Sequence, residues 1–118
     1  MSKLNKGLVL HMPLSQSWSK SATIATDKTP YENDGVIYGA TYTADRHGQP
    51  NSAMSFDGVD DYIDCGNDAS LNITNQITIS AWVNPVTSGH TGYEIVSKKT
   101  NWQDFNGYGL MIYPTNAQ

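Results

Sequence analysis

Residues 77–84 read Ile-Thr-Ile-Ser-Ala-Trp-Val-Asn, and this stretch is the clearest indicator of the fold class. Successive side chains of a β-strand point to opposite faces of the sheet, so apolar residues at every second position predict a strand with one buried face. That face would consist of Ile77, Ile79, Ala81 and Val83. We therefore expect residues 77–84 to form a central strand.

Seven further short segments have strand-like patterns, and no window has the i, i+3, i+4, i+7 apolar spacing of an amphipathic helix. They are residues 8–12, 35–39, 41–43, 53–56, 61–64, 93–98 and 108–113. Between them Gly, Asn and Asp recur, which favour tight turns because they adopt positive φ at little cost. Eight short strands predict an all-β sandwich or barrel. We expect residues 15–26, rich in Ser and Thr, to form a surface loop anchored by Trp18 and Ile24.

Composition and charge narrow the classes of function. The 118 residues match the size of one domain, residues 1–118. The formal net charge of −4, with scattered Lys and Arg, argues against a nucleic-acid partner, because binding to phosphates needs clustered cations. His11 and Pro13 interrupt the N-terminal apolar run, so neither a signal peptide nor a membrane-inserted segment is visible. The single cysteine, Cys65, is expected to be a small buried residue at a strand end.

Three segments together carry a resemblance to a known family. They are residues 7–14, the loop 27–35, and the stretch from 55 to 63 that leads on to residues 77–83. The loop has the spacing Asp27, Thr29, Asn33, Gly35, with Pro30 where the family usually has Gly; the later segment has Phe56, Asp57, Gly58, Asp61 and Tyr62. In this ordered set the chain resembles the laminin G-like branch of the concanavalin A-like lectin/glucanase superfamily, in its bacterial and phage form.

The resemblance implies an antiparallel two-sheet jelly-roll sandwich. Members of that superfamily have further strands after the segment matching residues 108–113, so we expect the jelly roll to be incomplete in this chain and the chain to be its N-terminal portion. A missing C-terminal segment or other protein subunits would then cover the open edge and apolar face. We accordingly expect an oligomer or a component of a larger assembly.

Calcium is the sharpest site hypothesis that the sequence offers. The cation takes six to eight oxygen ligands, and relatives often hold a structural calcium between loops of this kind. The candidate ligands lie in two glycine-containing loops, and Asp57 is the best single candidate. They are Asp27, Asn33, Asp57, Asp60 and Asp61. The alternative is that these residues cap turns by bonding to their own backbone.

A glycan or a protein partner is the second hypothesis. Sugars are commonly held by an aromatic face beside amides and hydroxyls, and residues 99–107 form a polar loop that contains Trp102. The candidate contact residues are Trp102, Tyr93, Phe105 and Tyr113, with Trp82 as an alternative. The same aromatics are also typical of protein interfaces and of packing between strands.

Catalysis is not expected. A glycosidase needs two carboxylates placed across the scissile bond, and the chain has no Glu-x-Asp-x-x-Glu run of the kind found in glucanases of this superfamily. His11, His47 and His90 lack metal-ligand spacing. The sequence therefore predicts a non-enzymatic structural or adhesion module in an extracellular or virion setting, such as a phage or virus particle or a bacterial surface assembly. The alternative is a carbohydrate-binding module of a longer extracellular enzyme or adhesin.

Overall fold

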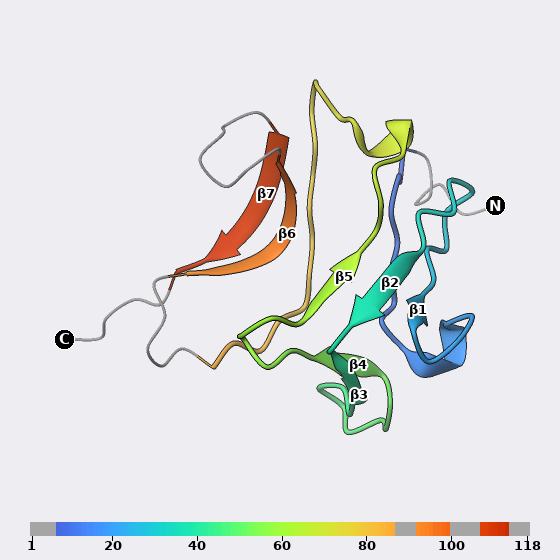
Figure 1. Cartoon of the computed structure of the whole chain (residues 1–118), viewed down its shortest axis with the longest axis vertical. Helices are drawn as coiled ribbons and strands as arrows, with labels where there is room; N and C mark the ends of the chain where they lie inside the picture. Colours follow the sequence, from blue (N-terminus) through green and yellow to red (C-terminus); the bar gives the residue numbers. More distant parts are fainter. Residues whose placement is uncertain (1–6, 87–91, 100–106, 114–118) are drawn as a thin grey trace. The chain divides into compact units, whose positions relative to one another are not determined.

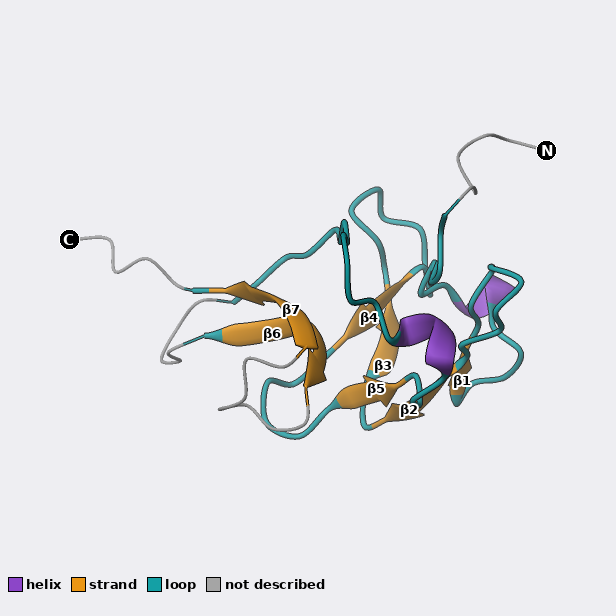
Figure 2. Cartoon of the chain, turned by 90° about the horizontal axis from the view of Figure 1, so that it is seen from above, coloured by secondary structure: helices purple, strands orange, loops and turns teal. Residues whose placement is uncertain are grey.

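The computed structural model describes residues 7–86, 92–99 and 107–113 (Figure 1). In these ranges the chain is all-β: its strands pair antiparallel in three small sheets, and no α-helix occurs among the described residues. The chain divides into two compact units, Met1–Leu71 and Asn72–Gln118. Loops connect the short strands throughout, as Figure 2 shows.

The first unit contains a three-stranded sheet of order β1-β2-β5, built from β1 (Ile24–Ala25), β2 (Gly35–Tyr38) and β5 (Tyr62–Asp64). Strand β2 lies in the middle, with Ile37 opposite Ile63 and Tyr38 opposite Tyr62. The rings of this last pair stack with their centroids 4.7 Å apart. Such cross-strand pairs help to fix the register of an antiparallel sheet.

The same unit contains a hairpin of β3 (Thr41–Thr43) and β4 (Ala53–Ser55), in which Tyr42 lies opposite Met54. Two single 3₁₀ turns complete it, η2 (Gln16–Trp18) and η3 (Ala69–Leu71). The second unit contains the hairpin of β6 (Tyr93–Lys99) and β7 (Gly107–Ile112), with an irregularity in the register between Glu94 and Val96.

Six of the predicted strands are found with their ends displaced by no more than one residue. Residues 8–12 are not a strand, and β1 lies within the predicted loop 15–26. Trp18 does not anchor that loop in a core, because its side chain is exposed; Ser15 and Ala25 are the buried residues there.

The prediction of a central strand at residues 77–84 is wrong for the described chain. The segment belongs to none of the three sheets, and Ile77 and Val83 of its predicted buried face are 41% and 45% exposed. Figure 1 shows the chain running extended through this stretch between η3 and β6. Alternation of apolar and polar residues determines which side chains would share one face of a sheet. A strand forms only when a neighbouring strand supplies its hydrogen bonds.

The interior of the first unit is small and partly polar. Among the described residues the buried apolar ones are Ala25, Ala40 and Leu71, while the buried polar ones are Ser15, Asp27, Thr29 and Asn33. Gly35 lies where a Cβ atom would overlap the side chain of Ile63. Close packing therefore requires a glycine at this position, whereas Gly58 has the positive φ, 79°, that a turn favours.

Candidate functional site

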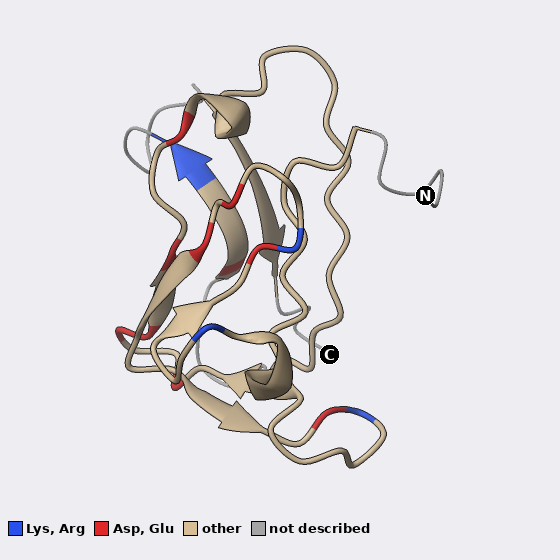
Figure 3. Cartoon of the chain, turned by 90° about the vertical axis from the view of Figure 1, so that its right-hand side faces the viewer, with Lys and Arg blue, Asp and Glu red and all other residues tan. Residues whose placement is uncertain are grey.

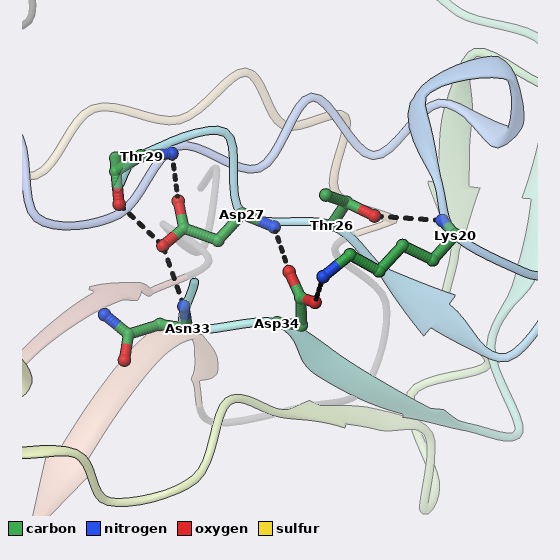
Figure 4. Close-up of polar contacts among 6 residues, drawn as sticks. All are labelled: Lys20, Thr26, Asp27, Thr29, Asn33 and Asp34. Atoms are coloured by element: carbon green, nitrogen blue, oxygen red, sulfur yellow. Dashed lines mark hydrogen bonds and ion pairs between the residues drawn. The ribbon is translucent and has the colours of Figure 1, made fainter. Parts of the chain in front are cut away.

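The loop that follows β1 is organised around a buried carboxylate, that of Asp27, which is 4% exposed (Figure 4). Its Oδ1 atom accepts hydrogen bonds from the backbone N–H groups of His11 and Thr29, both at 2.9 Å. Its Oδ2 atom accepts from the Thr29 hydroxyl at 2.7 Å and from the Asn33 N–H at 3.0 Å. We refer to Asp27, Thr29 and Asn33 as the Asp27 cluster.

The Asp27 cluster joins segments that are far apart in the sequence. The Asn33 Nδ2 group donates to the Val9 carbonyl at 3.1 Å and to the Ser70 hydroxyl at 2.9 Å. The N–H of Lys28 donates to the His11 carbonyl at 2.8 Å. The beginning of the described chain and the η3 turn are thereby both tied to the loop between β1 and β2.

Electrostatics favour the ionised form of the central carboxyl group. Burial raises the pKa of Asp27, but the hydrogen bonds from His11, Thr29 and Asn33 together lower it by more than burial raises it. The pKa of Asp27 therefore lies below its ordinary value. Beside it, the ion pair with Lys20 lowers the pKa of Asp34, whose Oδ1 atom accepts the Asp27 N–H at 2.9 Å.

These contacts bear on the calcium role predicted for Asp27 and Asn33. Each carboxylate oxygen of Asp27 already accepts two hydrogen bonds, and the Asn33 amide bridges Val9 and Ser70. A calcium ion would have to displace several of these bonds to gain one ligand. The hydrogen bonds are those of the turn-capping alternative that the sequence left open, and calcium at these two residues stays a prediction.

The other three predicted ligands do lie together, in the loop between β4 and β5. One carboxylate oxygen from each of Asp57, Asp60 and Asp61 lies within 4.8 Å of the others. The carboxylates also cap the loop: Asp57 Oδ1 accepts the Val59 N–H at 2.8 Å, and Asp61 Oδ2 accepts the Asp57 N–H at 2.9 Å. The donor type suits calcium, which would take its remaining oxygens from carbonyls or water. Calcium at this loop stays a prediction.

Of the predicted contact aromatics, only Tyr93 and Tyr113 lie in the part of the chain that the structure describes. Trp102 and Phe105 lie outside the described residues. The Tyr93 hydroxyl donates to the Val86 carbonyl at 2.7 Å, which gives it a structural role, and the exposed Tyr113 hydroxyl lies 3.5 Å from the Met111 sulfur. Trp82, the alternative, is 83% exposed.

A hollow that the sequence did not indicate lies beside the Asp27 cluster. It is lined by His11, Pro13, Trp18 and Lys28, and the Lys28 ammonium lies over the Trp18 ring, 4.8 Å from its centroid. In the sequence Trp18 comes before β1 and Lys28 comes after it, ten positions later. No local sequence pattern could therefore reveal their contact. We refer to these four residues as the Trp18 hollow.

The remaining reactive groups have simple environments. Cys65 directly follows β5 and is partly buried, with its sulfur 3.9 Å from that of Met12. Burial, together with the charges of Asp64 and Asp27, raises the pKa of the Cys65 thiol to about 11, which keeps it protonated and a poor nucleophile. Figure 3 shows Lys and Arg spread along the described chain, with Lys98 and Lys99 adjacent at the end of β6.

Comparisons with known proteins add no assignment. No family model matches the chain, and no curated protein or solved structure is significantly similar to it. Within the described ranges there is no helix of the length and apolar character needed to cross a bilayer.

Proposed function

We propose that this chain is a non-enzymatic structural or adhesion module that works as a component of an assembly, such as a phage or virus particle or a bacterial surface structure. The observation that carries the proposal is the segment of residues 72–86. It runs extended and outside the sheets of the described chain, and Ile77 and Val83 of its alternating apolar residues are about half exposed.

The composition of the 72–86 segment favours pairing. It contains no Asp, Glu, Lys, Arg or His, and its one proline, Pro85, stands near its end. Soluble proteins normally protect exposed strands with charges, prolines or bulges, because an open edge recruits other strands. An uncharged segment of β-branched and aromatic residues is therefore typical of a strand that has a partner in the functional state.

A second copy of the chain is the partner that we propose. Two antiparallel copies of an uncharged segment bring no like charges opposite each other, so pairing meets no electrostatic penalty. Complete burial of an Ile or Val side chain stabilises by about 1.5–3 kcal/mol. Ile77 and Val83 are about half exposed, so their further burial together would contribute about 1.5–3 kcal/mol in addition to the ladder hydrogen bonds.

The fold that we propose for the completed domain is the laminin G-like jelly roll. The order of the motifs and the antiparallel β2-β5 and β6-β7 pairs support it. In that arrangement residues 77–84 would form a paired strand with one buried face, as their alternation predicts. Loops between the strands would then face outward, where adhesive contacts with protein or glycan are made.

Light scattering after size exclusion, with the whole chain over about 10 μM to 1 mM, tests the proposal. We expect concentration-dependent self-association, together with slow hydrogen exchange of the amides of residues 77–83 in the associated form. The double variant Ile77→Lys/Val83→Lys should be monomeric, because it places charges along the pairing strand. The control Val59→Lys changes an 85% exposed valine in the loop between β4 and β5 and should associate like the parent chain.

Two results would overturn the proposal. One is a chain that stays monomeric over the whole concentration range; if that monomer is also retained on a polysaccharide resin, the carbohydrate-binding module becomes the better description. The other is a double variant that associates as strongly as the control, because the 72–86 segment would then not form the interface.

A further inference from the structure

The described chain contains two Asp-Gly pairs, Asp34-Gly35 and Asp57-Gly58. In such a pair the glycine nitrogen can attack the carboxyl carbon of the aspartate before it, because a glycine has no side chain to hinder the approach. The fold places the two pairs in opposite environments. The environment of each pair therefore decides whether it reacts.

The first pair is held in place on both sides. Asp34 Oδ1 accepts the Asp27 N–H at 2.9 Å, and Oδ2 forms an ion pair with Lys20. This ion pair lowers the pKa of Asp34, so the protonated carboxyl group that reacts is scarcer there. Gly35 is buried and begins β2 opposite Ala25. Ring closure at this pair would have to break both contacts of the carboxylate and disturb the start of the strand.

The second pair lies in the loop between β4 and β5, where residues 55–60 are all exposed. Gly58 has a φ of 79°, and a Cβ atom at this position would have no atom within 4 Å apart from its chain neighbours. Its N–H group donates no hydrogen bond to another described residue. The nitrogen that must react is therefore open to the solvent and to the carboxyl group beside it.

The carboxylate of Asp57 already lies over the peptide groups that follow it. Its Oδ1 atom accepts the Val59 N–H at 2.8 Å and the Asp60 N–H at 3.4 Å. A carboxyl group that bonds to the N–H two residues ahead is folded back toward the nitrogen between them, which is that of Gly58. Proximity of this kind speeds a reaction within one chain, because the reacting groups need little further ordering.

We propose that Asp57-Gly58 is a site of spontaneous isoaspartate formation, from which Asp34-Gly35 in the same chain is protected. The Gly58 nitrogen forms a bond to the Asp57 Cγ atom, and the carboxyl hydroxyl leaves as water together with the amide proton. The product is a succinimide ring. Water then opens the ring at either of its carbonyl groups. One opening restores aspartate, and the other leaves the main chain running through the former side-chain carbonyl as isoaspartate.

The modification changes the loop between β4 and β5 as the protein ages. Isoaspartate adds a carbon atom to the main chain and moves the free carboxylate to the former main-chain position. The cap that Asp57 forms on the Val59 and Asp60 N–H groups is then lost. The reaction needs no enzyme, and it does not depend on the assembly proposed above.

Incubation of the whole chain at about pH 5, where part of the aspartate carboxyl groups is still protonated, tests the proposal. Trypsin cleaves after Arg46 and so places Asp34 and Asp57 in separate peptides. Asn106, which precedes a glycine and can also give isoaspartate, falls in a third peptide. Electron-transfer fragmentation then locates isoaspartate in each peptide. We expect it to form several-fold faster at position 57 than at position 34. In guanidinium chloride, where the fold is lost, the two rates should become similar.

A pair of glycine variants tests the chemistry. Asparagine tolerates a positive φ but has a side chain beside the reacting nitrogen, so Gly58→Asn should slow isoaspartate formation at position 57 several-fold. Gly48→Asn is the matched control, because Gly48 has the same φ of 79° in equally open surroundings, and it should react like the parent chain.

Three results would overturn the proposal. The first is an equal rate at positions 34 and 57 in the folded chain. The second is a folded chain that forms no isoaspartate at position 57 over a period in which the denatured chain forms it. The third is a Gly58→Asn variant that reacts as fast as Gly48→Asn. The first two are read on the parent chain, so they hold even if a variant fails to fold.

Discussion

The Asp27 cluster and the 72–86 segment differ in whether their polar groups and side chains find partners within the described chain. In the cluster a buried carboxylate takes part in four hydrogen bonds, all from residues between His11 and Asn33. The segment has alternating apolar residues with the pattern of a strand, yet it lies outside the sheets of the described chain.

The difference lies in where the partners come from. A buried charge must have its donors close by, because an unsatisfied carboxylate in the interior costs several kcal/mol. A strand takes its partners from elsewhere in the fold, and its side chains reach a core only when those partners are present. The cluster is therefore complete within its own unit, whereas the segment has no partner strand among the described residues and, in our proposal, gains one in an assembly.

Asp27→Ala should give the largest loss of stability. It removes the acceptor of four hydrogen bonds and leaves three backbone N–H groups and a hydroxyl without their partner. We expect the free energy of unfolding to fall by about 3–5 kcal/mol, measured by urea denaturation at pH 7. This is a large part of the stability of an ordinary domain, so the first unit could fail to fold.

Asp45→Ala is the matched control for that substitution. The Asp45 carboxylate accepts the N–H groups of His47 and Gln49 at 2.8 and 3.0 Å, but the turn is exposed and water can replace the lost acceptor. Its loss should be clearly smaller. If the two alanine variants were equally destabilised, burial would not distinguish the Asp27 cluster from an ordinary capped turn.

Acidification should weaken the cluster next. The pKa of Asp27 is lowered in the folded protein from its ordinary 3.8, so its contribution to stability is complete above that value and is lost as the pH falls through the folded pKa. We expect the unfolding free energy to be level from about pH 7 to 5 and to fall below about pH 4. Asp34 and Asp68, whose pKa values are also lowered, add to the same slope.

Asp27→Asn separates the contribution of Asp27 from the others. The amide cannot titrate, so the variant should lose less stability between pH 5 and pH 2 than the parent chain, while starting from a lower value at pH 7. Parallel curves for the two proteins would mean that Asp27 is not a source of the acid sensitivity.

Much of the fold could be predicted from the sequence, since six short strands begin and end within one residue of the predicted positions. Turn residues mark those ends locally, as the positive φ of Gly58 illustrates. The pairing of residues 77–84 could not be predicted, because alternation specifies a face and not a neighbour. Strand β1 could not be predicted either, because its two residues are too few to show an alternating pattern.

The sequence says less about the surroundings of the candidate site residues, for a related reason. The sequence shows which residues carry oxygen atoms, and it therefore grouped Asp27 with Asp57 as calcium ligands. It does not show that four donors already fill the Asp27 carboxylate. Nor does it show that Lys28 reaches Trp18, because that contact depends on the path of β1 and the loops on both sides of it.

Of these substitutions, Ile77→Thr should change the free energy of unfolding least. It directly tests the contrast between the Asp27 cluster and the 72–86 segment. Threonine keeps the β-branched shape but removes apolar area, and Ile77 is already 41% exposed. At concentrations where the chain is monomeric we expect a change below about 0.5 kcal/mol in urea denaturation. Ile63→Thr, in the sheet opposite Ile37, should cost about 1–2 kcal/mol under the same conditions. A loss from Ile77→Thr as large as that from Ile63→Thr would mean that residue 77 is packed in the monomer, because an apolar side chain contributes to stability only where folding removes it from water.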